Sequence, residues 1–204
     1  MKALPKKLLP LILFGIAVTS LFSVQPAQAY MVTLEQVGAN VVATGSGAIN
    51  LTGLTFLGSI SSGNFSALNP AFGSISTGPS GSQNLDEYSG FTGPASFGPS
   101  GFGSFADSGS GDPVAILGRT GFLLVPQGYV SGAALSDTMT FNSRSFASMG
   151  VTPGTYVWTW GTGLPNQNFT LIIGRTGVPD AGSTVSLLGF VLLGLAALRR
   201  KLSC

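Results

Sequence analysis

The sequence predicts an all-β body similar to a β-sandwich, flanked by an N-terminal signal helix and a C-terminal transmembrane helix. Residues 30–177 are rich in glycine, serine and threonine, and their short alternating apolar runs do not follow helical periodicity. An apolar segment follows three lysines near the N-terminus, and residues 181–198 form an uncharged apolar run before a basic cluster. We therefore divide the chain into a signal peptide (1–29), a glycine-rich ectodomain (30–177) and a C-terminal signal (178–204).

The first segment has the composition of a secretory signal peptide. Residues 8–24 form an apolar core, and Ala27 and Ala29 give the small-x-small pattern that signal peptidase accepts. An uncleaved anchor helix is the alternative, but Pro26 just before this pattern favours cleavage. We therefore predict export and a mature N-terminus at Tyr30. The basic region that precedes the apolar core consists of Lys2, Lys6 and Lys7.

Alternation and turn residues predict strands in the body. Residues 31–47 indicate two strands around a turn at 38–40, and residues 120–129 contain a strand that Pro126 ends. The clearest hairpin joins Thr155–Trp160 to Phe169–Ile173. Residues 134–141 alternate strictly, and one face of that strand carries Leu135, Asp137, Met139 and Phe141.

The strand pattern weakens from Ser74 to Gly111. This stretch contains glycine, serine and proline without a strict period. It predicts long irregular loops with one or two short strands. Recurring phenylalanines are expected to hold these loops to the body: Phe91, Phe97, Phe102 and Phe105.

The composition of the body excludes several function classes. Between Tyr30 and Gly177 there are no His, Lys or Cys residues, which excludes a Ser-His-Asp triad, a Cys-His pair, a Ser-Lys dyad and zinc sites built on His or Cys. This region contains three arginines and six carboxylates, so its net charge is negative and no basic surface for nucleic acid is expected. We expect no enzyme activity, no catalytic residue, no metal and no cofactor.

Carboxylates leave one enzymatic alternative open, a carbohydrate-active enzyme that works through a carboxylate pair. Asp86 and Glu87 are adjacent, however, and neighbours on a strand point to opposite faces. Asp107 and Asp112 could bracket Ca²⁺, although a solvated acidic loop is the favoured interpretation.

Tyr156, Trp158 and Trp160 alternate onto one face of the last hairpin. An exposed row of this kind could stack on sugar rings. A buried row would belong to the sandwich core, and this is the interpretation that we favour.

The C-terminal segment has the properties of a membrane span with a stop-transfer signal. At about 1.5 Å per residue, a helix over 181–198 reaches roughly 27 Å, enough to cross a hydrocarbon core. Positive charge stays on the cytoplasmic side, so the body is expected outside and the tail inside. Cys204 then lies on the cytoplasmic side. The stop-transfer cluster consists of Arg199, Arg200 and Lys201.

A short proline-containing motif, a span and a basic cluster together resemble the sorting signals that exosortases read. The segment resembles the VPDSG-CTERM class, a sister of the PEP-CTERM class. Ala181 stands where the class usually has Ser. The proposed sorting residues are Val178, Pro179, Asp180, Ala181 and Gly182. The body is also similar to the uncharacterised β domains of many exported proteins of this kind.

This resemblance implies a route and a set of partners. Signal peptidase and an exosortase-type membrane enzyme would process the chain, and the C-terminal helix would hold it in the membrane until then. The implied location is the membrane, then the envelope surface or the extracellular matrix. We expect a non-enzymatic exported surface or matrix protein associated with exopolysaccharide, with the carbohydrate-active enzyme as the alternative.

Overall fold

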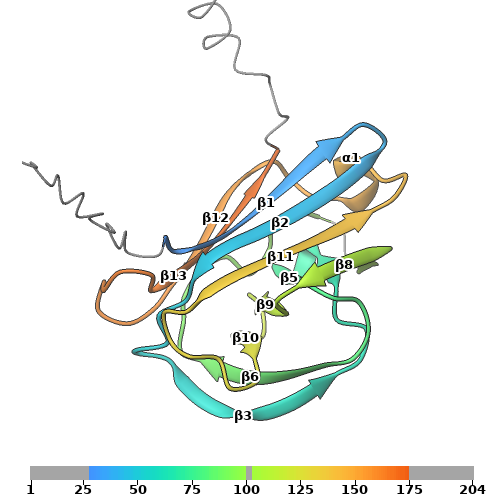
Figure 1. Ribbon diagram of the computed structural model, residues 1–204. Coiled ribbons are helices and arrows are strands. Elements are labelled where there is room, and N and C mark those ends of the chain that lie inside the picture. Colours follow the sequence, from blue (N-terminus) through green and yellow to red (C-terminus); the bar gives the residue numbers. More distant parts are fainter. Residues whose placement is uncertain (1–27, 100–102, 175–204) are drawn as a thin grey trace, which may run out of the picture.

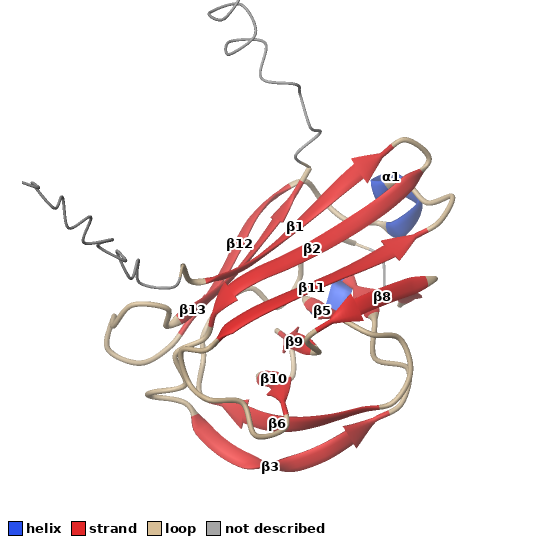
Figure 2. Cartoon of the chain, in the orientation of Figure 1, coloured by secondary structure: helices blue, strands red, loops and turns tan. Residues whose placement is uncertain are grey.

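The body consists of two β-sheets that face each other across an apolar core, as the sequence predicts (Figure 1). The computed structural model describes residues 28–99 and 103–174. Figure 2 shows that strands make up most of this part and that its helices are short. They are the 3₁₀-helix η1 (Pro70–Phe72) and the α-helix α1 (Phe146–Met149). The predicted signal helix and transmembrane helix lie outside the described residues.

Six strands form the first sheet, called sheet A here. In spatial order they are β12 (Gly154–Thr159), β13 (Asn168–Ile173), β1 (Tyr30–Val37), β2 (Asn40–Ala48), β11 (Ala134–Phe141) and β8 (Ser108–Gly111). Seven strands form sheet B, in the order β3 (Thr55–Ser62), β6 (Gln83–Ser89), β10 (Phe122–Pro126), β9 (Val114–Leu117), β5 (Ser74–Thr77), β4 (Ala67–Asn69) and β7 (Ser104–Phe105).

Alternate residues of both sheets fill the core, because successive side chains of a strand point to opposite faces. Tyr30, Val32 and Leu34 of β1 are fully buried, and their neighbours are only partly buried. Ile116 and Leu123 supply the facing side chains from sheet B. This arrangement confirms the two-sheet body that the alternation predicted.

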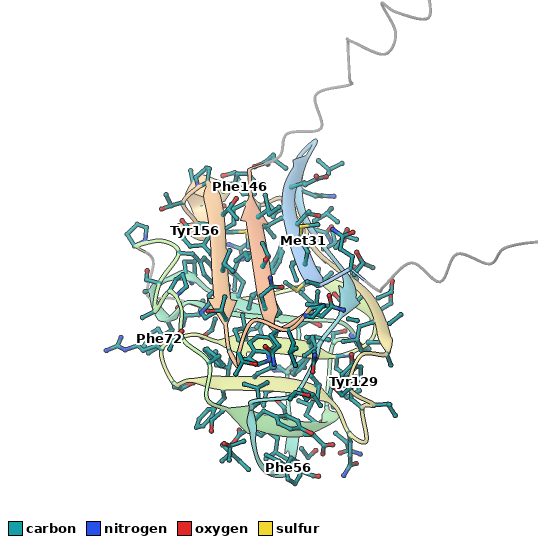
Figure 3. All side chains as sticks on the ribbon, turned by 90° about the vertical axis from the view of Figure 1, so that its left-hand side faces the viewer. Met31, Phe56, Phe72, Tyr129, Phe146 and Tyr156 are labelled. Carbon is teal, nitrogen blue, oxygen red and sulfur yellow. The ribbon has the colours of Figure 1, made fainter. Side chains whose placement is uncertain are left out.

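β1 and β13 determine where the two ends of the body lie. They pair in parallel, with Tyr30 opposite Phe169 and Leu34 opposite Ile173. The chain therefore begins β1 at one end of sheet A and leaves β13 at the other, as Figure 1 shows. In Figure 3, Phe146 of α1 lies at the end where β13 finishes, and Phe56 of β3 lies at the opposite end.

The predicted strands before residue 50 and after residue 120 are confirmed. β1 and β2 pair around Gly38, β10 ends at Pro126, and β12 pairs with β13 as an antiparallel hairpin. The predicted face of β11 is the buried one. Within the described residues, the longest helix has four residues, which agrees with the expectation of an all-β body.

The prediction for residues 74–111 was wrong in extent. Four strands, β5, β6, β7 and β8, replace the expected one or two. β6 was missed because it carries Asp86 and Glu87 instead of an apolar alternation, and β8 because its sequence is Ser-Gly-Ser-Gly. Phe97 is buried as expected, but Phe105 is 62% exposed and does not hold the loop to the core. Phe102 lies outside the described residues.

Candidate functional site

The predicted signal-cleavage point lies at the edge of the folded body. Ala27 is outside the described residues. Ala29 forms an isolated bridge with Ala48, whose N–H donates to the Gln28 carbonyl oxygen at 2.8 Å. Tyr30, the predicted first residue of the mature chain, begins β1 and is fully buried. Cleavage between Ala29 and Tyr30 stays a prediction, and it would leave every strand of the body whole.

The C-terminal residues singled out from the sequence come soon after the last strand. β13 ends at Ile173, and the Gly174 N–H donates to the Leu34 carbonyl oxygen at 3.1 Å. The sorting residues 178–182, the span 181–198 and the stop-transfer cluster 199–201 all lie outside the described residues. Between residues 28 and 174, gaps excluded, no helix is long and apolar enough to span a membrane.

Asp86 and Glu87 are not arranged as a facing pair. Asp86 is buried and accepts hydrogen bonds from Ser59 Oγ at 2.6 Å and from Gly128 N at 2.8 Å. Asp86 lies opposite Val125, a residue of the inter-sheet core, and its neighbour Glu87 points to the other face of β6. Asp86 therefore links β3 to the turn after β10.

Asp107 and Asp112 hold the two ends of β8 to β11. Asp107 Oδ2 accepts from the Asn142 N–H at 2.7 Å, and Asp112 Oδ2 accepts from the Ser136 N–H at 2.8 Å. Each carboxylate thus satisfies a backbone donor at its own end of the strand pair. In the described part of the chain, no group of three or more His, Cys, Asp or Glu could hold a metal ion. Both carboxylates are therefore acceptors within the fold, one at each end of strand β8, and the predicted acidic loop is interrupted by that strand.

The aromatic row of the last hairpin belongs to the core. Trp158 is fully buried, Trp160 is nearly so, and Tyr156 packs at the margin of the core. Both indole N–H groups donate to backbone carbonyl oxygens, Trp158 to Pro94 at 2.8 Å and Trp160 to Asn50 at 2.7 Å. The core interpretation is confirmed, and the alternative of an exposed stacking ladder is wrong.

A pocket of about 510 Å³ lies where the β12–β13 loop meets the segment after β6. Its lining combines two threonines, two amides, three glycines and two apolar side chains, and none of these residues is charged. They are Gly90, Thr92, Thr159, Trp160, Gly161, Gly163, Leu164, Gln167 and Asn168. Most of the lining residues are exposed, so the pocket opens to solvent.

Gln167 fixes the shape of this pocket. Its Oε1 accepts from the Thr162 N–H at 3.0 Å and from the Leu164 N–H at 2.8 Å. Its Nε2 donates to the Thr52 carbonyl oxygen at 2.6 Å. Thr92 and Thr159 join the two walls through reciprocal backbone hydrogen bonds of 2.9 and 2.8 Å. The pocket is therefore preformed by the fold.

A buried polar cluster connects the two sheets near the start of β1. The Tyr30 hydroxyl donates to Asp137 Oδ2, and Tyr30 Oη lies 3.1 Å from Thr77 Oγ1 of sheet B. Asp137 Oδ1 is buried and has no hydrogen-bond partner among the described residues.

Burial raises the pKa of Asp137 to about 6, despite the lowering effect of the Tyr30 hydrogen bond. Burial and the nearby Asp137 carboxylate raise the pKa of the Tyr30 phenol well above its ordinary value, so this hydroxyl remains a donor.

Sequence reasoning placed Asp137 on an apolar face but drew nothing from that position. A lone carboxylate among apolar residues of an alternating strand is the signal that could have identified it. The pocket was missed altogether, because its walls come from segments about 70 residues apart and its polar residues have no motif spacing.

The comparisons with known proteins identify the C-terminal segment. A family model described as the VPDSG-CTERM motif matches residues 177–202. The chain carries a VPDSG-CTERM motif. No curated protein and no solved structure matches the chain.

The VPDSG-CTERM motif confirms the resemblance drawn from residues 178–204. It is the signal of an exported, envelope-associated protein, and it implies processing by an exosortase-type enzyme. The matched residues begin only three positions after Gly174. The motif therefore follows almost directly on the end of sheet A at which β13 finishes.

Proposed function

We propose that this protein is a non-enzymatic surface or extracellular-matrix protein, sorted through its VPDSG-CTERM motif and associated with exopolysaccharide. The observation that carries the proposal is the motif at 177–202, directly after a folded β body. In this account signal peptidase cuts after Ala29. Residues 181–198 then hold the chain in the membrane until an exosortase-type enzyme cuts near residues 178–182 and releases the body to the surface.

The two parts of the C-terminal signal act through different forces. Each Leu, Ile, Phe or Val stabilises insertion of the span by about 0.3–0.6 kcal/mol, whereas each Arg or Lys at mid-span costs about 2.5–3.5 kcal/mol. Translocation therefore halts at Arg199–Lys201. Pro179 disfavours a helical conformation of the residue before it, so in this proposal the processing enzyme would bind the motif as an extended peptide.

The body supports a binding or structural role more than a catalytic one. A glycosidase needs two carboxyl groups about 5–10 Å apart across its cleft. The 510 Å³ pocket has no Asp or Glu in its lining. Asp86, Asp107 and Asp112 hold elements of the fold together through hydrogen bonds. We therefore prefer a non-enzymatic function to the carbohydrate-active enzyme.

The double variant Pro179→Ala/Asp180→Ala tests the proposed sorting. It is expected to insert into the membrane normally but to remain there at full length, because the span is intact and the processing enzyme no longer recognises the motif. Ser183→Ala/Thr184→Ala is the matched control, since it changes two neighbouring residues outside the five-residue motif and should be cut and released like the wild type. The measurement is immunoblotting of membrane, surface and medium fractions. Release of the Pro179/Asp180 variant at the wild-type rate would show that the tail is an ordinary anchor.

A further inference from the structure

The pocket between the β12–β13 loop and the Gly90–Thr92 segment has the chemistry of a site for a neutral polyhydroxylated ligand. Thr92 and Thr159 contribute hydroxyl groups and Asn168 contributes a side-chain amide, whereas the buried Gln167 amide is already bonded to backbone groups. Leu164 is 48% exposed at the pocket and offers an apolar surface of the kind that covers the C–H face of a sugar ring. With no charged residue in the lining, nothing there would compensate the charge of a phosphate, a uronate or an ammonium group.

The size and rigidity of the pocket agree with this ligand class. Its volume of about 510 Å³ lies within the range of about 300–1,000 Å³ that is typical of small-molecule sites. Gln167 and the Thr92–Thr159 bridge fix both walls before any ligand arrives. Preorganisation of this kind lowers the conformational cost of binding.

Asn168 and Thr159 form one polar part of the pocket wall. Asn168 lies opposite Thr159 in the β12–β13 pair, so the two side chains share a face of sheet A. Because Thr92 and Thr159 already satisfy each other's backbone groups, the wall offers no free strand edge there to an extended peptide.

The position of the pocket suits a displayed protein. Asn168 begins β13 and Gly174 follows its end, which separates them by about 20 Å at about 3.3 Å per residue. The loop between β12 and β13 lies at the end of the body opposite to the end of β13 (Figure 1). In sequence, the C-terminal motif begins three residues after Gly174, and so follows the end of β13 that lies opposite to the pocket.

We propose that this pocket binds one or two neutral sugar units of a polysaccharide. This inference deepens the proposed function and rests on it only for the source of the sugar. The pocket would hold the chain ends or branches of an uncharged polymer by hydrogen bonds to hydroxyl groups, with Leu164 against a ring face. No bond is made or broken.

The test measures binding of neutral disaccharides, cellobiose and maltose, to the released protein by calorimetry, with cellobiouronic acid as the charged counterpart. The neutral sugars should bind, and the uronate should bind more weakly.

Leu164→Asp should weaken binding about tenfold or more, as expected when an apolar contact in a pocket is lost. Leu57→Asp is the matched control, because Leu57 is equally exposed at 49% on β3, outside the pocket, and this variant should bind like the wild type. Unchanged unfolding midpoints in both variants establish that the fold is intact.

The outcomes separate this inference from the proposed function. Absence of binding by all three sugars, equal binding by Leu164→Asp and the wild type, or selective capture of an extended peptide would overturn the pocket assignment. If Leu164→Asp is sorted normally and still associates with cell-surface polysaccharide, the pocket assignment fails and the proposed function stands. If the wild type binds disaccharides in solution but does not associate with polysaccharide on cells, the proposed association fails and the pocket assignment stands.

Discussion

The free energy of unfolding is expected to decrease by about 3 kcal/mol between about pH 3 and about pH 7 through Asp137 alone. Burial raises the pKa of Asp137 from 3.8 to about 6, so the folded protein binds this proton more tightly than the unfolded chain does. The stabilisation is therefore complete below the unfolded pKa and is lost as the pH rises through the folded value. Tyr30 and Asp112 are the titratable groups near Asp137, and Asp112 adds to the upward shift of its pKa.

Asp137→Asn isolates this effect. The amide oxygen can still accept from the Tyr30 hydroxyl, but the group no longer ionises. In urea unfolding of the released protein, the free energy of unfolding of Asp137→Asn should be close to that of the wild type near pH 4. It should exceed that of the wild type near pH 7. Glu87→Gln controls for the loss of one negative charge. A constant difference between Asp137→Asn and the wild type at every pH would contradict this prediction.

Gly45→Ala is expected to destabilise the body by about 2–4 kcal/mol, at or above the usual cost of overpacking, because the same change also disturbs a buried hydrogen bond. Gly45 lies on β2 opposite Asp137. A Cβ there would lie closer than 3.0 Å to the Tyr30 hydroxyl oxygen and to both carboxylate oxygens of Asp137. Neither side chain has room to move, since Tyr30 is fully buried and Asp137 is 4% exposed.

Denaturant midpoints of Gly45→Ala and of Gly63→Ala test this prediction. Gly63 is the matched control, because a Cβ there meets no atom within 4 Å. Tyr30→Phe removes the hydroxyl group that obstructs the new methyl group. The double variant Gly45→Ala/Tyr30→Phe should therefore lose less free energy of unfolding than the two single variants lose together. A Gly45→Ala protein as stable as the Gly63→Ala protein would contradict the described geometry.

The sequence predicted those strands whose apolar residues alternate. β1, β2, β11 and the β12–β13 hairpin each place every second residue in the core, and this period is visible without a structure. β6 and β8 could not be predicted in this way. Asp86 is buried on β6 because Ser59 and Gly128 satisfy its carboxylate, and both partners are distant in sequence.

The candidate sites likewise fall into two groups, those that a local sequence pattern reveals and those that distant segments form together. The VPDSG-CTERM motif is a local pattern, so the sequence alone was sufficient to predict it. The Tyr30–Asp137–Thr77 cluster and the pocket depend on pairings between distant segments. For example, Tyr30 and Asp137 meet only because β1 and β11 both flank β2. No spacing in the sequence encodes that contact.

Intact-mass analysis of the protein released from cells tests the sorting account most directly. The account predicts a chain that begins at Tyr30 and ends within or close to Val178–Gly182, so that the apolar run 181–198 and the basic cluster 199–201 are missing from the released form. In cells without the exosortase-type enzyme, the same body should stay in the membrane with Arg199–Lys201 attached. A released protein that still carries Cys204 at its C-terminus, or release that does not depend on this enzyme, would contradict the account.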